Sequence, residues 1–185
     1  MALQGTGPRL FRLQALLREY LNAEVDAIDT AATTHAEIYA DNFETPNLLP
    51  KDIQVFRDDR EGECVTVVII PTGARRPHGL DKHGPGANQS RYDTDHAFEL
   101  YVTAKSNTGT WGEHGAWLRA DRVAHGVTAC LLKYSTLAIA AQSLTGLALW
   151  SEIDDWERLP TEEKDDTMAV TLVASLTVRT MERIA

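Results

Sequence analysis

The N-terminal part of the chain carries a clear helical pattern. Its apolar residues recur at intervals of three and four, namely Leu10, Leu13, Leu17, Leu21, Val25 and Ile28. This spacing places them on one face, so the pattern predicts an amphipathic helix over residues 9–29. Pro8 stands just before it, where its missing N–H removes no intrahelical bond.

A second helix is predicted over residues 115–133. Its apolar stripe consists of Trp117, Ala120, Ala124, Val127, Cys130 and Leu131. Arg119 and Arg122 lie off this stripe. A helix with one apolar stripe buries it against another element, and we expect this one to pack on a sheet.

Strands are predicted where apolar and polar residues alternate or where β-branched residues cluster. Residues 53–55 and 64–70, the latter ended by Pro71, are expected to form two antiparallel strands, and residues 96–104 a third. Residues 147–154 and the longest strand, 167–181, should pair as a terminal hairpin. The inward parity of the long strand is Met168, Val170, Leu172, Ala174, Leu176 and Val178.

Residues 72–95 are expected to form a long exposed loop. The stretch 72–90 contains four Gly and two Pro with almost no apolar residues, a composition that cannot build a core. Helices segregated over a mainly antiparallel sheet define an α+β fold, with the second helix packed on the sheet and a C-terminal β-hairpin. The 185 residues are within the range of a single domain, and we assign 1–185 to one.

Charge and composition exclude several classes of protein. The chain has 18 Lys and Arg against 27 Asp and Glu, a net charge of −9 with neutral His, which argues against a protein that grips DNA. No apolar run reaches the roughly 20 residues that a membrane helix needs, and the N-terminus lacks a signal-peptide core. We therefore expect a soluble protein that is not exported and has no membrane partner. Two Cys are too few for a disulfide framework.

No common enzyme motif is present, because the sequence lacks a Walker loop, GxGxxG, GxSxG and HExxH. One cluster could bind a metal: His78, Asp81, His83, Asp93, Asp95 and His96. A Gly- and Pro-rich loop offers few rigid neighbours to orient ligands, so we interpret these residues as solvated polar side chains. The prediction is a non-enzyme without catalytic, metal-binding or cofactor-binding residues. A metal-dependent hydrolase that uses this cluster is the alternative class.

The charges are unevenly distributed along the chain. Residues 152–166 hold eight acids and two bases, a net of −6, and residues 72–92 hold four bases and one acid, a net of +3. These segments are either two solvated loops or complementary patches on opposite sides of one subunit. Complementary patches favour head-to-tail association into a closed ring.

Four segments in this order resemble the tail-terminator (tail-completion) proteins of long-tailed bacteriophages. They are RLFRLQALLREYL, HAFELYVTAKS, AWLRADRVAHGVTACLL and TMAVTLVASLTVRTMER, and the resemblance in pattern and element order extends from about Arg9 to Arg183. It implies a structural virion protein that forms a hexameric ring on the tail tube, stops its polymerisation and joins tail to head. The implied partners are further copies of the chain, the tail tube protein and head–tail connector proteins.

The resemblance also implies a location in the tail or neck of the virion, after assembly in the host cytoplasm, and DNA that passes without tight binding. Another neck or head-completion protein is the alternative within this class. We expect the subunit interface to involve Arg75, Arg76, Lys82, Arg91, Glu162 and Glu163. Acidic residues facing the lumen would repel phosphate, and the candidates are Asp154, Asp155, Asp165 and Asp166.

Overall fold

A computed structural model describes residues 10–24, 53–54, 65–75, 90–108, 112–133 and 148–184 of the chain. The elements are, in chain order, α1 (Leu10–Ala23), β1 (Ile53–Gln54), β2 (Val65–Arg75), β3 (Ser90–Asn107), α3 (Gly112–Lys133), β4 (Ala148–Ile153), β5 (Glu157–Arg158), β6 (Glu162–Lys164) and β7 (Thr167–Ile184). This arrangement confirms the predicted α+β class. None of the described helices is both long and apolar enough to span a bilayer.

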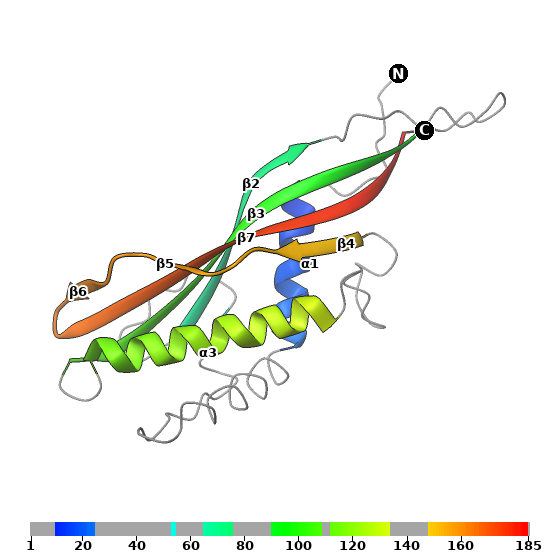
Figure 1. The fold of residues 1–185 in the computed structure, drawn as a ribbon. Helices are drawn as coiled ribbons and strands as arrows, with labels where there is room; N and C mark the ends of the chain where they lie inside the picture. Colours follow the sequence, from blue (N-terminus) through cyan, green and yellow to red (C-terminus); the bar gives the residue numbers. More distant parts are fainter. Residues whose placement is uncertain are drawn as a thin grey trace.

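The sheet is built around two long antiparallel strands, β3 and β7, which pair from Ser90 with Ile184 to Asn107 with Thr167. The strand order is β1-β2-β3-β7-β4. Figure 1 shows β4, β5 and β6 following one another along the side of β7 that β3 leaves open. The predicted pairing of residues 147–154 with the terminal strand is confirmed. Its connection adds β5 and β6, which give hydrogen-bond partners to β7 backbone groups.

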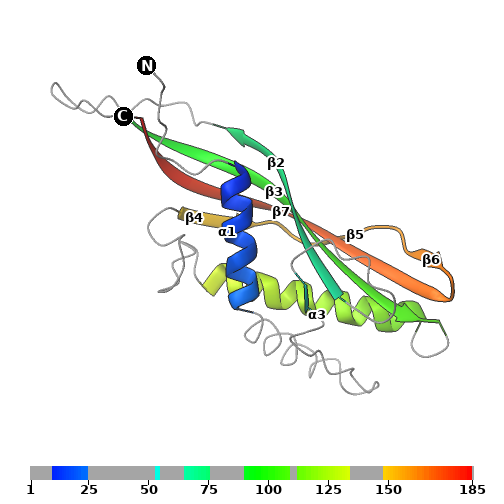
Figure 2. The same ribbon diagram turned by 180° about the vertical axis from the view of Figure 1, so that it is seen from behind.

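The hydrophobic core lies on one face of the sheet. The inward parity predicted for the last strand is confirmed from Val170 on, because Val170, Leu172, Ala174, Leu176 and Val178 are all buried, whereas Met168 is half-buried. Residues of both helices belong to the same core cluster. Figures 1 and 2 show α3 running along the sheet, with α1 close to the C-terminal end of α3. There the Tyr20 hydroxyl of α1 donates a hydrogen bond of 2.7 Å to the Cys130 carbonyl of α3.

The two N-terminal strands pair in parallel, so the antiparallel prediction was wrong. Ile53 pairs with Val65 and Gln54 with Thr66. The turn-forming residues between the strands indicate a break in the chain but do not fix a strand direction. Direction is decided by the backbone pairing of the folded sheet, which local composition does not encode.

Both ends of the predicted 72–95 loop belong to strands instead. β2 continues beyond Pro71 to Arg75, and β3 already begins at Ser90. The β2–β3 register shifts between Pro71 and Gly73. An irregularity on a strand near the sheet edge accommodates a residue that has no N–H to donate. Residues 76–89 of the predicted loop lie outside the described residues.

Helix α3 is buried over a wider arc than its stripe predicts. It begins at Gly112, which has a positive φ of 54°, and Arg122 is only 3% exposed although we placed it off the apolar stripe. Leu118, one turn earlier, is buried as well. Burial lowers the pKa of the Arg122 guanidinium, the charge of Arg119 lowers it further, and Asp121 opposes both. Periodicity identified the best-buried stripe but not its full width.

Candidate subunit-interaction surfaces

A row of polar side chains crosses four strands on the sheet face opposite the core. Arg75 of β2 pairs with Asp95 of β3, Asp95 with Arg179 of β7, and Arg179 with Trp150 of β4. The Arg179 guanidinium donates two hydrogen bonds to the Asp95 carboxylate, from Nε to Oδ1 at 2.6 Å and from Nη2 to Oδ2 at 2.7 Å. Its central carbon lies 4.8 Å from the centre of a Trp150 ring. Two guanidinium groups thus flank one carboxylate.

This ion pair favours the charged form of Asp95. The hydrogen bond from Arg179 holds the pKa of Asp95 below its usual value; burial opposes this shift, and the charges of Arg179, His96 and Arg75 support it. The two side chains of the pair keep 31% and 26% of their exposure, so water screens part of their attraction. The row still carries one more positive than negative charge, because Arg75 and Arg179 share a single acid.

Asp95→Asn should destabilise the protein by about 1 kcal/mol, because Arg179 loses the negative charge of its partly exposed bidentate partner. The native pKa of Asp95 is lowered, so its contribution is complete above the unfolded pKa near 3.8 and disappears as pH falls through the native value. Urea titrations at pH 7 and at pH 3 should therefore differ less for the variant than for the wild type. Glu162→Gln, on exposed β6, is the control; an equal pH response of Asp95→Asn and wild type would contradict the prediction.

The described members of the candidate metal cluster do not converge. Asp95 is engaged by Arg179 on the sheet face opposite the core, whereas His96 is 2% exposed on the core side and its Nε2 lies 2.9 Å from Thr180 Oγ1. Within the described ranges, no group of three or more His, Cys, Asp or Glu residues could hold a metal ion. His78, Asp81 and His83 lie outside the described residues, and Asp93 is described only as part of β3.

The acidic segment 152–166 forms an exposed border along β7. Glu152 pairs with Thr177, and the Asp154 N–H donates a 2.9 Å hydrogen bond to the Ser175 carbonyl. All eight acids of the segment are exposed: Glu152, Asp154, Asp155, Glu157, Glu162, Glu163, Asp165 and Asp166. The last two form the turn into β7 with positive φ values of 48° and 60°. A turn of this handedness matches the twist of a hairpin.

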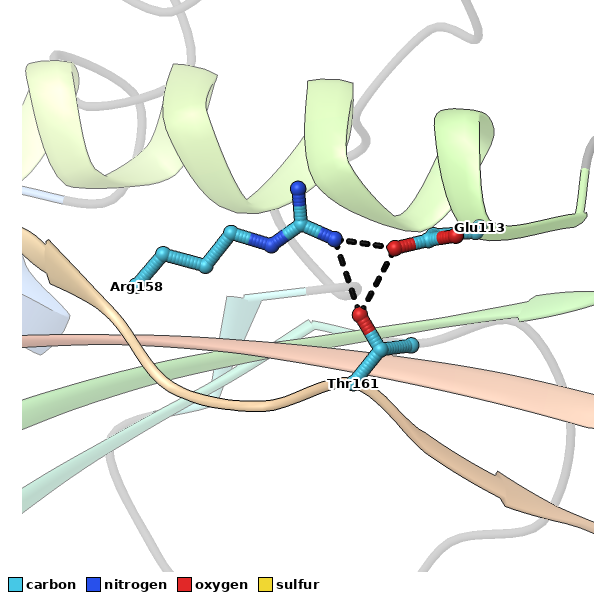
Figure 3. Close-up of polar contacts among 3 residues, drawn as sticks. All are labelled: Glu113, Arg158 and Thr161. Carbon is cyan, nitrogen blue, oxygen red and sulfur yellow. Dashed lines mark hydrogen bonds and ion pairs between the residues drawn. The ribbon is translucent and has the colours of Figure 1, made fainter.

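The border is attached to the start of α3 by three side chains (Figure 3). Arg158 donates hydrogen bonds to the Glu113 carboxylate and, at 2.8 Å, to the Thr161 hydroxyl. The Thr161 hydroxyl donates a 2.8 Å bond to the same Glu113 oxygen. The bond from Thr161, followed by that from Arg158, lowers the pKa of Glu113. One of the two bases of the segment is therefore engaged within the subunit, and most of the acids face outward.

Among the described residues predicted for the interface, Arg75 and Glu162 lie far apart within one subunit. Arg75 is exposed and lies level with Arg179 of β7, whereas Glu162 pairs with Ala169. Ten β7 residues separate those levels, or ~34 Å at roughly 3.4 Å per residue. Arg91 lies in β3, while Arg76 and Lys82 lie outside the described residues. Any contact between Arg75 and Glu162 therefore requires two different copies of the chain.

Sequence reasoning missed two exposed apolar residues on opposite edges of the sheet. Ile70 on β2 is 42% exposed and Leu159, between β5 and β6, is 37% exposed. Leu159 had a signal, because it is an apolar residue within an acidic segment. No sequence signal marks Ile70 as exposed, because it is the last residue of an apolar run for which burial is predicted.

Comparisons with known proteins leave the family open. No protein-family model and no curated protein matches the chain. It is similar to a chain from the virion of a native gene transfer agent particle, at 16% identity and a TM-score of 0.31, over 85% of this chain and 98% of that one. A likeness of this size carries no argument about fold or function.

Proposed function

We propose that the protein is a structural virion component that forms a ring at the end of a phage tail tube. The ring stops polymerisation of the tube and joins the tail to the head while DNA passes through it. Its partners are further copies of the same chain, six in the complete ring, the tail tube protein and the head–tail connector proteins. The proposal assigns no catalytic or cofactor-binding residue.

The observation that carries the proposal is the opposite charge of the two sheet edges. Arg75 is exposed at the end of β2, and the acidic border lies beyond β7 on the other side of the sheet. Different patches on opposite edges of one subunit form a heterologous contact, which closes into a ring when the rotation between neighbours permits. The element order that resembles tail terminators selects the tail end as the place for such a ring.

The exposed acids also suit a passage for DNA. Asp154 and Asp155 lie near the start of the border, between β4 and β5, and Asp165 and Asp166 lie at its tip, in the turn into β7. Carboxylates on the wall of a channel repel phosphate, so the genome slides without stopping at individual contacts. The proposal places these four residues toward the lumen.

The alternative is another neck or head-completion protein, which forms a ring but contacts the portal instead of the tube. A metal-dependent hydrolase is less well supported, because Asp95 and His96 face opposite sides of β3.

Electron microscopy tests the proposal directly. We expect negative-stain images of the purified protein, with and without tail tubes, to show six-fold rings that cap the tube. Particles assembled without the protein should carry tails of uncontrolled length. Tails of normal length that lack only a head connection would favour the neck protein, and protein that forms no ring in either sample would contradict both.

A further inference from the structure

The open edge of β2 presents one apolar and one basic side chain at a defined spacing. Within the described residues, β2 pairs on its outer side only at Val65 and Thr66, with β1. Farther along, Ile70 lies level with Ser175 of β7, and Arg75 lies level with Arg179. The two exposed side chains are thus four β7 positions apart, with Arg75 toward the C-terminal end of β7.

The opposite edge presents a matching pair at the same spacing. The Leu159 N–H bonds the Thr171 carbonyl, and the Asp154 N–H bonds the Ser175 carbonyl. Leu159 and Asp154 are therefore also four β7 positions apart, with the charged residue again toward the C-terminal end. Arg75 and Asp154 carry opposite charges, whereas Ile70 and Leu159 are apolar and have large exposed fractions.

We infer that neighbouring subunits join edge to edge with an offset of four residues, so that Arg75 meets Asp154 and Ile70 meets Leu159 of the next copy. A single shift along the strands makes both contacts at once. β2 and the facing segment would run antiparallel. Pro71 and Pro160 interrupt the backbone ladder between the two edges, so the four side chains complete the contact that a partial ladder begins. The inference rests on the ring proposed above.

The offset agrees with the geometry of closed sheets. A sheet that closes on itself needs tilted strands and a staggered register, with tilts typically near 35–45°. An offset of four residues is ~14 Å along the strands, and four strands per subunit are ~19 Å wide at roughly 4.8 Å each. The corresponding tilt is about 35°. Contact of Arg75 with Glu162 needs an offset of ten residues, which gives a tilt of about 60° on the same estimate.

The inference changes the roles of two groups of acids. It makes Asp154 an interface residue, and it leaves Asp155, Asp165 and Asp166 as the candidates for the lumen. Glu162 and Glu163 would not contact Arg75.

Charge exchange tests the contact in the full-length protein. Arg75→Glu and Asp154→Arg should each weaken self-association by about tenfold per interface in sedimentation velocity, and the double variant should recover most of the loss. The matched control combines Arg75→Glu with Glu162→Arg, which introduces the same charges and should not recover. Recovery in the control instead of the Asp154 pair would overturn the inference.

Cross-linking tests the offset. A 1:1 mixture of Ile70→Cys and Leu159→Cys proteins should give covalent dimers under mild oxidation, and neither variant should do so alone. Ile70→Cys mixed with Asp154→Cys tests an offset of zero and should give none. Rings that form normally but cross-link only through this second pair would overturn the offset and leave the proposed function intact. A wild-type protein that stays monomeric with and without tail tubes would overturn both.

Discussion

Leu176→Asp is expected to abolish cooperative folding. Leu176 is 1% exposed in the middle of β7, where it pairs with Phe98 on one side and Ile153 on the other. The substitution removes most of a buried apolar side chain and places a carboxylate without a partner in the core. Each change costs several kcal/mol, and their sum is comparable to the total stability of a typical domain, roughly 5–15 kcal/mol.

Circular dichroism and differential scanning calorimetry measure this effect. The matched control is Ser175→Asp, one position earlier on the exposed face of the same strand. It introduces the same charge and should change the melting temperature little. If Leu176→Asp melted like the wild type, the assignment of the core face would be wrong.

Reversing the charge of Arg75, at the end of β2, and of the next residue in the chain, with Arg75→Glu and Arg76→Glu together, should prevent ring assembly at low salt. The change places new acids against the acidic border of the next subunit, where like charges repel. Added salt should assist assembly of the variant and weaken assembly of the wild type, because screening acts on repulsion and attraction alike.

Light scattering across a range of ionic strength measures both responses. Arg158→Glu is an unsuitable control, because that side chain anchors the border to α3. Lys105→Glu, on β3 within the sheet, alters the net charge by two units without changing either edge. Assembly of the Arg75/Arg76 variant with unchanged extent and salt dependence would remove the electrostatic contact from the proposed function.

The periodic patterns predicted the parts of the fold that depend on one segment alone. The inward parity of β7 follows from its alternation of apolar and mainly polar residues, and the buried face of α1 follows from apolar residues three and four apart. Each of these two patterns indicates which side of an element is apolar. The apolar side is a property of the segment's own sequence, so it is present before any tertiary contact forms. The charged character of residues 152–166 was equally evident, because exposed charges need no partner.

The candidate surfaces depended on pairing between distant segments. The sequence predicted that Arg75 and the acids of residues 152–166 are complementary groups. It did not predict on which strands of the sheet they lie. The contact of Asp95 with Arg179 joins residues 84 positions apart in the chain. No local pattern indicates such a pair, because strand register is fixed by the whole sheet.

The sequence by itself thus determined the class of fold, the core faces of its main elements and the two charged segments. Tertiary structure alone decided the direction of β1, the true ends of β2 and β3, the burial of Arg122 and the placement of opposite charges on opposite edges. The physical reason is the range of the interactions. Periodicity records the exposure of single segments to water, whereas strand order and register arise only when distant segments share hydrogen bonds and a common core.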